Sequence, residues 1–365
     1  MNSKDIKFDC RHFRGGIPCL PNKLRNKVCD RCDEYSPVTK SILIIKLGAL
    51  GDVIRTTPLV TRFRKEFPGC KITWITHSPE ILPKKLIEEI LPFNFISVYG
   101  ITHRKFDIAI NLDKETEACA LLADVNSKQK FGFIWLDGHI GIANHDAEHK
   151  LITGAFDSIS KENKKNYLVE IFEICGMDFR GEEYLLDVNE MYFEKWNSLR
   201  VNANGKLIIG LNTGCGKRWL TRIWPGNYWI ELINLLQSEG YFPVLLGGKD
   251  EDDQNKQFAA ETKAFYPGTY SLEEFIALSS HCDVIVSAVS MMMHIAIGLK
   301  KPLILFNNIF NRNEFFLYER GAIVEPESGC DCFYGNTCTR NEHCMNDLKP
   351  DSVFKAIMKN TKDIK

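Results

Sequence analysis

Short apolar runs alternate along this chain with stretches whose apolar residues recur at helical spacing. Short runs of Ile, Leu and Val that end at glycine or polar residues are typical of strands buried in a parallel sheet. In the first part of the chain we expect such strands at residues 41–47, 70–77 and 106–113. Helices are expected between and after them, at residues 53–67, 78–90 and 114–125. Pro58 predicts that the first of these helices starts late or is kinked.

The same alternation restarts after a less regular stretch at residues 128–200, which holds one expected helix near 166–176. Strands are expected at 206–214, 242–248, 283–289 and 302–308, and helices after Pro225 and at 271–282 and 290–299. Alternating strands and helices predict doubly wound α/β sheets. We therefore expect an N-terminal arm (1–40), a first Rossmann-like domain (41–200) and a second (201–365), with the active site in the cleft between the two.

Composition and charge narrow the class of protein. The chain has 365 residues, 44% of them hydrophobic and 25% charged, with a formal net charge of -1. A nucleic-acid-binding protein normally shows a strong basic excess, so nucleic acid is not an expected partner. There is no run of eighteen apolar residues, and the first residues lack the apolar core of a signal peptide. The expected location is the cytoplasm, with peripheral attachment to the inner face of a membrane left open.

Eight of the thirteen cysteines fall into two clusters. The first, in the N-terminal arm, consists of Cys10, Cys19, Cys29 and Cys32, and four thiolates are the ligand set of a structural metal site. This favours zinc or another thiophilic metal, such as iron, but only Cys29 and Cys32 have the close spacing of metal ligands. The second cluster consists of Cys330, Cys332, Cys338 and Cys344, whose irregular spacing leaves metal binding and buried free thiols as alternatives.

Asp52 is the first candidate for chemistry, because it follows the turn of Gly48 and Gly51 at the end of the first expected strand. A carboxylate there can act as a general base that takes a proton from an attacking hydroxyl. It can equally cap the helix that follows, and from this residue alone the cap is the better explanation.

A second glycine-rich turn lies in NTGCGKRWLTRIWP, residues 212–225. Such a turn exposes backbone N–H groups, and a following helix N-terminus favours anions. Lys217, Arg218 and Arg222 add positive charge suited to a diphosphate, although a solvated basic loop would have the same composition. Asp113, at the end of another expected strand, is a candidate for contacts to sugar hydroxyls or a further helix cap.

KLGALGDVIRTTPLV (46–60) and the 212–225 segment together resemble glycosyltransferase family 9, the heptosyltransferases. The resemblance covers roughly residues 41–355 and implies a GT-B fold, two Rossmann-like domains facing a central cleft. It implies that Asp52 is the catalytic base and that the acceptor lies on the N-terminal half, where Asp113 is the candidate acceptor contact named above. It also implies a donor site formed by Thr213, Gly214, Lys217, Arg222, Glu251, Ser290, Met291 and His294, with Glu251 at the ribose. Val289 and Met291 replace the aspartate and glycine of the family pattern, so the donor is either bound differently or is not ADP-heptose.

The expected function is therefore inverting transfer of a sugar, heptose by the resemblance, from a nucleotide-diphosphate donor to a hydroxyl of a glycan, lipopolysaccharide, other lipid-linked or protein acceptor. The resemblance implies no cofactor for catalysis, while an iron-holding cysteine cluster occurs in related autotransporter heptosyltransferases. The alternatives are a non-catalytic nucleotide-sugar-binding protein and another Rossmann-type sugar-nucleotide enzyme. A Rossmann oxidoreductase would need a G-x-G-x-x-G turn after the first strand, which GALGD does not supply.

Overall fold

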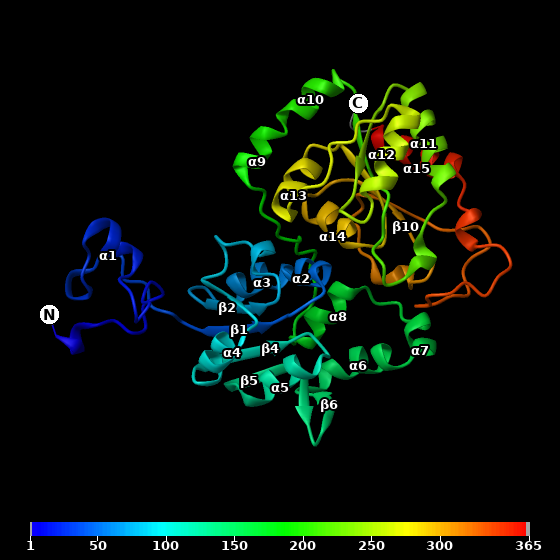
Figure 1. Ribbon diagram of the computed structural model, residues 1–365. Helices are drawn as coiled ribbons and strands as arrows, with labels where there is room; N and C mark the ends of the chain where they lie inside the picture. The colour runs from blue at the N-terminus through cyan, green and yellow to red at the C-terminus, as the bar shows by residue number, and fades with distance from the viewer. Residues whose placement is uncertain (1, 363–365) are drawn as a thin grey trace. The chain divides into compact units, whose positions relative to one another are not determined.

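The computed structural model describes residues 2–362, and contacts between residues group them into two compact units (Figure 1). The first unit contains the chain up to Gly48 together with Thr56–Leu151 and Ile171–Glu182. The second contains Ala49–Arg55, Ile152–Glu170 and the chain from Glu183 onwards. The domain boundaries expected at residues 40 and 200, and the cleft expected between two domains, stay predictions.

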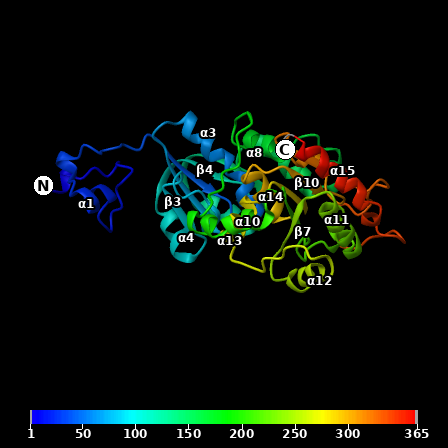
Figure 2. The same ribbon diagram turned by 90° about the horizontal axis from the view of Figure 1, so that it is seen from above.

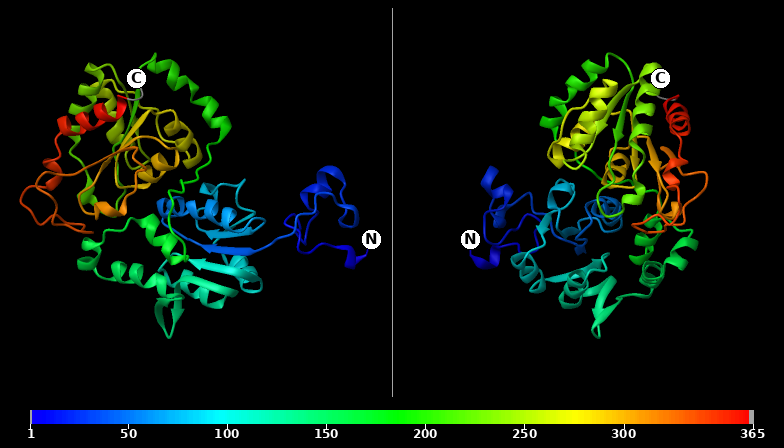
Figure 3. Two further views of the ribbon diagram at one scale, coloured as in Figure 1. Left: turned by 180° about the vertical axis from the view of Figure 1, so that it is seen from behind. Right: turned by 45° about the vertical axis from the view of Figure 1, so that its right-hand side comes forward.

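The first unit is built on a six-stranded sheet of order β3-β2-β1-β4-β5-β6. Its strands are β1 (Ser41–Ile45), β2 (Lys71–Thr76), β3 (Glu89–Pro92), β4 (Lys105–Asn111), β5 (Asn126–Leu136) and β6 (His139–Ile142). All neighbours are parallel except β5 and β6, which form an antiparallel hairpin that extends beyond the rest of the sheet (Figure 3). Ile42 in β1 lies between Ile72 and Ile108, and β1 is buried on both faces, which explains its continuous apolar run.

The helix expected at residues 78–90 is wrong. Only a short 3-10 helix, Pro79–Ile81, forms there, and β3 begins at Glu89 and pairs with β2. Pro79 and Pro83 interrupt any longer helix. The last residues of the segment instead pair with β2 as the edge strand of the sheet, where a proline such as Pro92 is tolerated.

The helices of the first half of the chain follow the sequence pattern in part. They are α1 (Leu20–Arg25), α2 (Leu50–Thr56), α3 (Pro58–Glu66), α4 (Phe95–Thr102), α5 (Thr116–Asp124), α6 (Glu148–Ala155), α7 (Asp157–Glu162) and α8 (Tyr167–Ile174). The predicted break at Pro58 is confirmed, since α2 ends at Thr56 and Pro58 begins α3. Figure 1 shows α3 on one face of the sheet and α4 and α5 on the other. Leu43 and Ile45 of β1 pack in one core with Ile101 of α4 and Leu122 of α5.

The second unit holds a five-stranded, wholly parallel sheet of order β11-β10-β9-β7-β8. Its strands are β7 (Ile208–Asn212), β8 (Phe242–Leu246), β9 (Val284–Ala288), β10 (Leu303–Phe306) and β11 (Gly321–Val324). Its longer helices are α9 (Glu190–Lys195), α10 (Asn197–Ala203), α11 (Gly226–Ser238), α12 (Asp252–Thr262), α13 (Leu272–Ser280), α14 (Met291–Gly298) and α15 (Pro350–Thr361). Helices α12 and α15 both contact α11 (Figure 2), and the core packs Trp224 and Trp229 against Phe306. The expected α/β class with two Rossmann-like sheets is confirmed.

Among the helices of residues 2–362, none combines the length and apolar character that crossing a bilayer demands. The cytoplasmic location stays a prediction.

Candidate functional site

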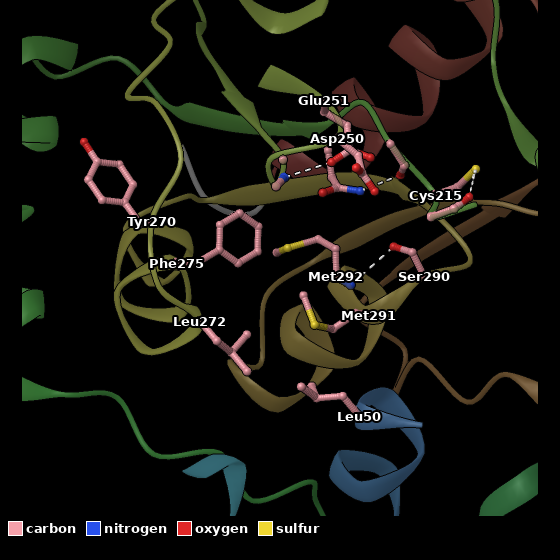
Figure 4. Close-up of a pocket in the computed structure, with 15 residues that line it drawn as sticks. Leu50, Cys215, Asp250, Glu251, Tyr270, Leu272, Phe275, Ser290, Met291 and Met292 are labelled. Carbon is pink, nitrogen blue, oxygen red and sulfur yellow. Dashed lines mark hydrogen bonds between the residues drawn. The ribbon is translucent and has the colours of Figure 1, made fainter. Parts of the chain in front are cut away.

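A cavity of about 430 Å³ lies in the second unit (Figure 4). Its lining comes from the segments that follow β7, β8 and β9, together with the beginnings of α2, α13 and α14. Because these strands are parallel, their carboxyl ends meet at one edge of the sheet, which is where open α/β sheets bind ligands. The lining residues are Leu50, Asn212, Gly214, Cys215, Gly216, Gly247, Gly248, Asp250, Glu251, Tyr270, Leu272, Phe275, Ser290, Met291 and Met292.

The turn after β7 is shaped by a close approach to Glu251. A Cβ built on Gly214 would overlap the Glu251 carboxylate, so only glycine fits at this position without displacing it. One oxygen of that carboxylate accepts the Gly248 N–H at 2.9 Å, which holds the acidic side chain against both glycine turns. Thr213 is buried beneath the turn and donates to Oδ1 of Asn255 at 2.7 Å. Thr213 therefore supports the cavity from behind, while Gly214 and Glu251 line it.

Arg222 ties two of the loops that line the cavity. Its buried guanidinium donates to the backbone carbonyls of Cys215 and Val289, and its Nε donates to that of Trp219 at 3.2 Å. Burial lowers the pKa of Arg222. Lys217, in contrast, is largely exposed and pairs with Asp250 at 2.7 Å, so its ammonium stands at the surface. The two cations proposed for a diphosphate therefore differ: Arg222 holds the loops together from inside, whereas Lys217 is exposed at the surface.

The start of α14 forms the floor of the cavity in Figure 4. Ser290 caps this helix, with its hydroxyl accepting the Met292 N–H at 3.3 Å. Met291, where the family pattern has glycine, also lines the cavity and is 37% exposed. The helix N-terminus presents N–H groups suited to an anion, next to an apolar surface formed by methionine side chains and Leu50.

Asp52 belongs to α2, whose residue Leu50 lines the cavity, but its own side chain is not part of the lining. Its Oδ1 pairs with Nη2 of Arg55 at 2.7 Å. The Arg55 guanidinium lies 3.3 Å from the centroid of the Tyr167 ring, a cation–π contact. Burial opposes the charge of Arg55, yet the Asp52 carboxylate raises the pKa of Arg55 above its ordinary value. The ion pair thus fixes the position of the Asp52 carboxylate beside a partly buried cation.

His294 connects α14 with α2. A Cβ on Gly51 would overlap the His294 ring, so the two helices approach closely at this point. The ring stacks on Tyr184 with centroids 6.2 Å apart and planes 14° apart. Burial, and then the nearby Arg55, lower the pKa of His294 to about 3, so the imidazole is neutral near pH 7. Its Nδ1 has no hydrogen-bond partner within residues 2–362.

Asp113 lies in the first unit and is buried at the carboxyl ends of β4 and β1. Its two oxygens accept from Nζ of Lys46 and from the N–H of Leu47. Burial raises the pKa of Asp113, and the Lys46 cation opposes that rise. These contacts tie two strands together, and an acceptor-binding role for Asp113 stays a prediction.

The four cysteines of the N-terminal arm all line one small cavity of about 40 Å³. The cysteines are Cys10, Cys19, Cys29 and Cys32, and none is in a disulfide. Even so, in the part of the chain described here no three or more His, Cys, Asp or Glu side chains are arranged to hold a metal ion. The convergence of the cysteines on one cavity agrees with the sequence analysis, whereas a metal at this position stays a prediction.

Part of the cavity wall was not identified from the sequence. Tyr270, Leu272 and Phe275 line the end opposite Glu251 and Cys215 in Figure 4. They lie at and before the start of α13, whose periodicity is that of a core helix, so no sequence signal separates them from core residues. Asn212 also lines the cavity, and it does stand in the glycine-rich motif. Its Nδ2 donates to the Gly214 carbonyl at 2.8 Å and so holds the turn.

Comparison with known proteins gives one family. The model of glycosyltransferase family 9 (heptosyltransferase) matches residues 99–308, more than half of the chain. Lipopolysaccharide heptosyltransferase 2 of Salmonella typhimurium is 35% identical over 102 residues, which is 26% of this chain and 28% of that protein. The chain is thus matched over little more than a quarter of this curated relative.

Solved structures share the fold along most of the chain. The glycosyltransferase family 9 protein of Veillonella parvula superposes with a TM-score of 0.68 and 17% identity, covering 89% of this chain and 98% of that one. ADP-heptose lps heptosyltransferase II of E. coli superposes with a TM-score of 0.64 and 15% identity, covering 89% and 99%.

Proposed function

Because the chain belongs to glycosyltransferase family 9, we propose that it transfers a sugar from a nucleotide-diphosphate donor to an acceptor hydroxyl. The observation that carries this proposal is the cavity in which a glycine turn and a helix N-terminus converge beside the α2 segment that bears Asp52. ADP-heptose is the expected donor, because relatives are named as lipopolysaccharide heptosyltransferases. The acceptor is a glycan, a lipopolysaccharide or other lipid-linked saccharide, or a protein, and the reaction takes place in the cytoplasm.

The donor binds with its diphosphate between the Gly214–Gly216 turn and the N-terminus of α14. Backbone N–H groups and the Ser290 hydroxyl contact the phosphate oxygens, and the helix dipole favours their charge. Arg222 keeps the two loops in place and adds a buried positive charge behind them. Glu251 accepts from ribose hydroxyls. The other end of the cavity, at Tyr270 and Phe275, offers aromatic rings suited to the nucleobase of the donor.

In the reaction Asp52 accepts the proton of the acceptor hydroxyl as its oxygen attacks the anomeric carbon. The bond from that carbon to the diphosphate oxygen breaks, and the electron pair leaves with the diphosphate. Attack opposite to the leaving group inverts the anomeric centre. Arg55 holds one oxygen of Asp52 and so orients the carboxylate. The reaction needs no bound metal; zinc or iron in the N-terminal arm would be structural.

Two measurements on the purified protein test this proposal. Calorimetric titration with ADP measures binding in the cavity, and release of ADP from ADP-heptose in the presence of heptose-deficient lipopolysaccharide measures transfer. We expect saturable ADP binding and acceptor-dependent ADP release. ADP binding without release from any donor of a nucleotide-sugar panel would identify a non-catalytic binder. No binding of any nucleotide would overturn the proposal.

A further inference from the structure

An unusually apolar surface lies on α4, in the first unit and away from the cavity. Phe95, Ile96 and Tyr99 are 79%, 81% and 58% exposed, and these three residues define the α4 patch. The opposite side of the helix is anchored in the core by Ile101, which is fully buried, and by Val98. The helix thus carries apolar residues on both sides, although only one side has a protein core to pack against. Single exposed apolar residues are common, whereas a contiguous group usually marks a binding surface.

The exposed rings form an ordered row along the helix. Phe95 and Tyr99 stack with centroids 5.8 Å apart, and Tyr99 continues to His103 at 4.4 Å. The Asn94 side chain caps the helix by accepting the Ser97 N–H at 2.9 Å, so the first turn is well formed. The row runs the length of an eight-residue helix, which is about 12 Å. This geometry gives a shallow apolar strip rather than a groove.

Two exposed lysines stand before and after α4 in the chain, and the two acids between these lysines are paired. Lys85 precedes β3 and Lys105 follows α4, and both are exposed. Arg104 pairs with Glu89 at 2.7 Å, which brings the chain before β3 to the same end of the unit as the end of α4. Glu88, the other acid between Lys85 and Lys105, pairs with Arg64 at 2.7 Å. Helix α4 itself carries no charged side chain.

We propose that the α4 patch docks on the surface of a lipid bilayer that contains anionic phospholipid. Aromatic side chains with polar tips prefer the level of the headgroups, and flanking lysines are attracted to anionic lipids. A strip of this depth suits headgroups better than a folded partner, which would need a complementary concave surface. Docking would hold the unit against the membrane where a lipid-linked acceptor is found, and so it extends the proposed function. It is tested separately from that function, because vesicle binding requires no transfer.

The test is flotation of the 365-residue chain with two kinds of vesicle. One kind contains phosphatidylethanolamine and phosphatidylglycerol, and the other contains phosphatidylcholine alone. We expect the protein to float with the anionic vesicles and much less with phosphatidylcholine. A triple variant, Phe95→Ser with Ile96→Ser and Tyr99→Ser, should reduce the bound fraction at least tenfold. Lys85→Gln with Lys105→Gln should reduce binding to the anionic vesicles alone, and high salt should reduce it in the same way.

Matched controls separate the patch from exposed apolar residues in general. Met191→Ser with Val201→Ser alters two residues that are similarly exposed on α9 and α10 and should leave flotation unchanged. Unchanged ADP binding and melting temperature would show that the triple variant is folded. The proposal is overturned if the wild type floats with neither vesicle or if the triple variant floats like the wild type. It is also overturned if the patch instead mediates self-association, seen as a dimer that the triple variant abolishes.

Discussion

Oδ1 of Asp52 lies 2.7 Å from Nη2 of Arg55, one helical turn further along α2. The partner guanidinium is itself held against the Tyr167 ring at 3.3 Å. The Asp52 carboxylate is therefore fixed by a partly buried cation, while its role as catalytic base or helix cap stays to be tested.

Replacing Asp52 by Asn tests the base directly. We expect transfer to fall by about 10²–10⁴-fold, the usual contribution of general-base catalysis, with ADP affinity unchanged, since Asp52 does not line the cavity. Exposed Asp187→Asn is the control and should be fully active. Arg55→Met should lower kcat more than it raises KM for the donor, because it releases the carboxylate without touching the donor site. Normal transfer by the Asn variant would rule out Asp52 as the base.

Because Gly51 and His294 are in close contact, adding one methyl group at residue 51 should lower the stability of the protein. Gly51→Ala should lower the free energy of unfolding by about 1–3 kcal/mol, because the new Cβ overlaps the imidazole. Gly48→Ala, with no atom within 4 Å of its Cβ, should change it by less than about 0.5 kcal/mol. Denaturant unfolding of both variants, and of Gly51→Ala combined with His294→Ala, measures the coupling. An additive double variant would mean that the strain lies elsewhere.

The same histidine predicts a pH dependence of stability. The pKa of His294 is lowered to about 3 by burial and by Arg55, from an ordinary value near 6.5, so the unfolded chain binds this proton more readily than the folded one. The residue has no effect on stability well above pH 6.5, and its destabilising effect grows as the pH falls toward 3. Comparing the urea unfolding of wild type and His294→Gln at pH 7.5 and pH 5 isolates the contribution of His294 to the loss of stability. Stability should fall less on acidification in the variant, and equal losses would contradict the argument.

Arg222 and Lys217 should respond differently to loss of charge. Arg222→Gln leaves the buried carbonyls of Cys215 and Val289 without a cation, and we expect a loss of about 2–4 kcal/mol in unfolding free energy together with weaker ADP binding. Lys217→Gln removes an exposed pair with Asp250, so stability should be unchanged and ADP affinity reduced by less than about fivefold. Thermal unfolding and calorimetry check both. The reverse pattern would assign the diphosphate to Lys217.

The four cysteines of the N-terminal arm predict a bound metal ion that native mass spectrometry can detect. Since four cysteines line one cavity, we expect about one thiophilic metal ion per chain by native mass spectrometry, lost in Cys29→Ser with Cys32→Ser. Cys70→Ser, at a buried cysteine outside both clusters, is the control. Metal-free protein with an unchanged arm would show that the thiols are simply packed together.

The sequence pattern predicted the parallel strands best. The runs that became β1, β2, β4 and β7–β10 are short, apolar and bounded by turn residues, so their local signal agrees with their tertiary setting. The pattern gave no strand at β3, β5, β6 or β11. Residues 84–90 carry helix-forming Lys, Leu and Glu, and only pairing with β2 makes their end a strand. β5 begins with the polar run Asn126–Lys130, which lacks the apolar signal of a buried strand.

The candidate site shows the same limit. Gly214 and Ser290 stand out because turns and helix caps are local features. Arg55 and Tyr184 do not stand out, because their roles arise from contacts with residues distant in the sequence.

The assignment of Ala49–Arg55 to the second unit has a consequence for building chimaeras from related chains. A recombination point near residue 200 looks natural from the order of the strands. It would nevertheless take α14 from one parent and both the α2 segment and Tyr184 from the other. His294 would then contact a helix and an aromatic ring that come from a different parent. An exchange that keeps the second unit together must carry residues 49–55 and 152–170 along with the chain from 183 onward, as one non-contiguous block.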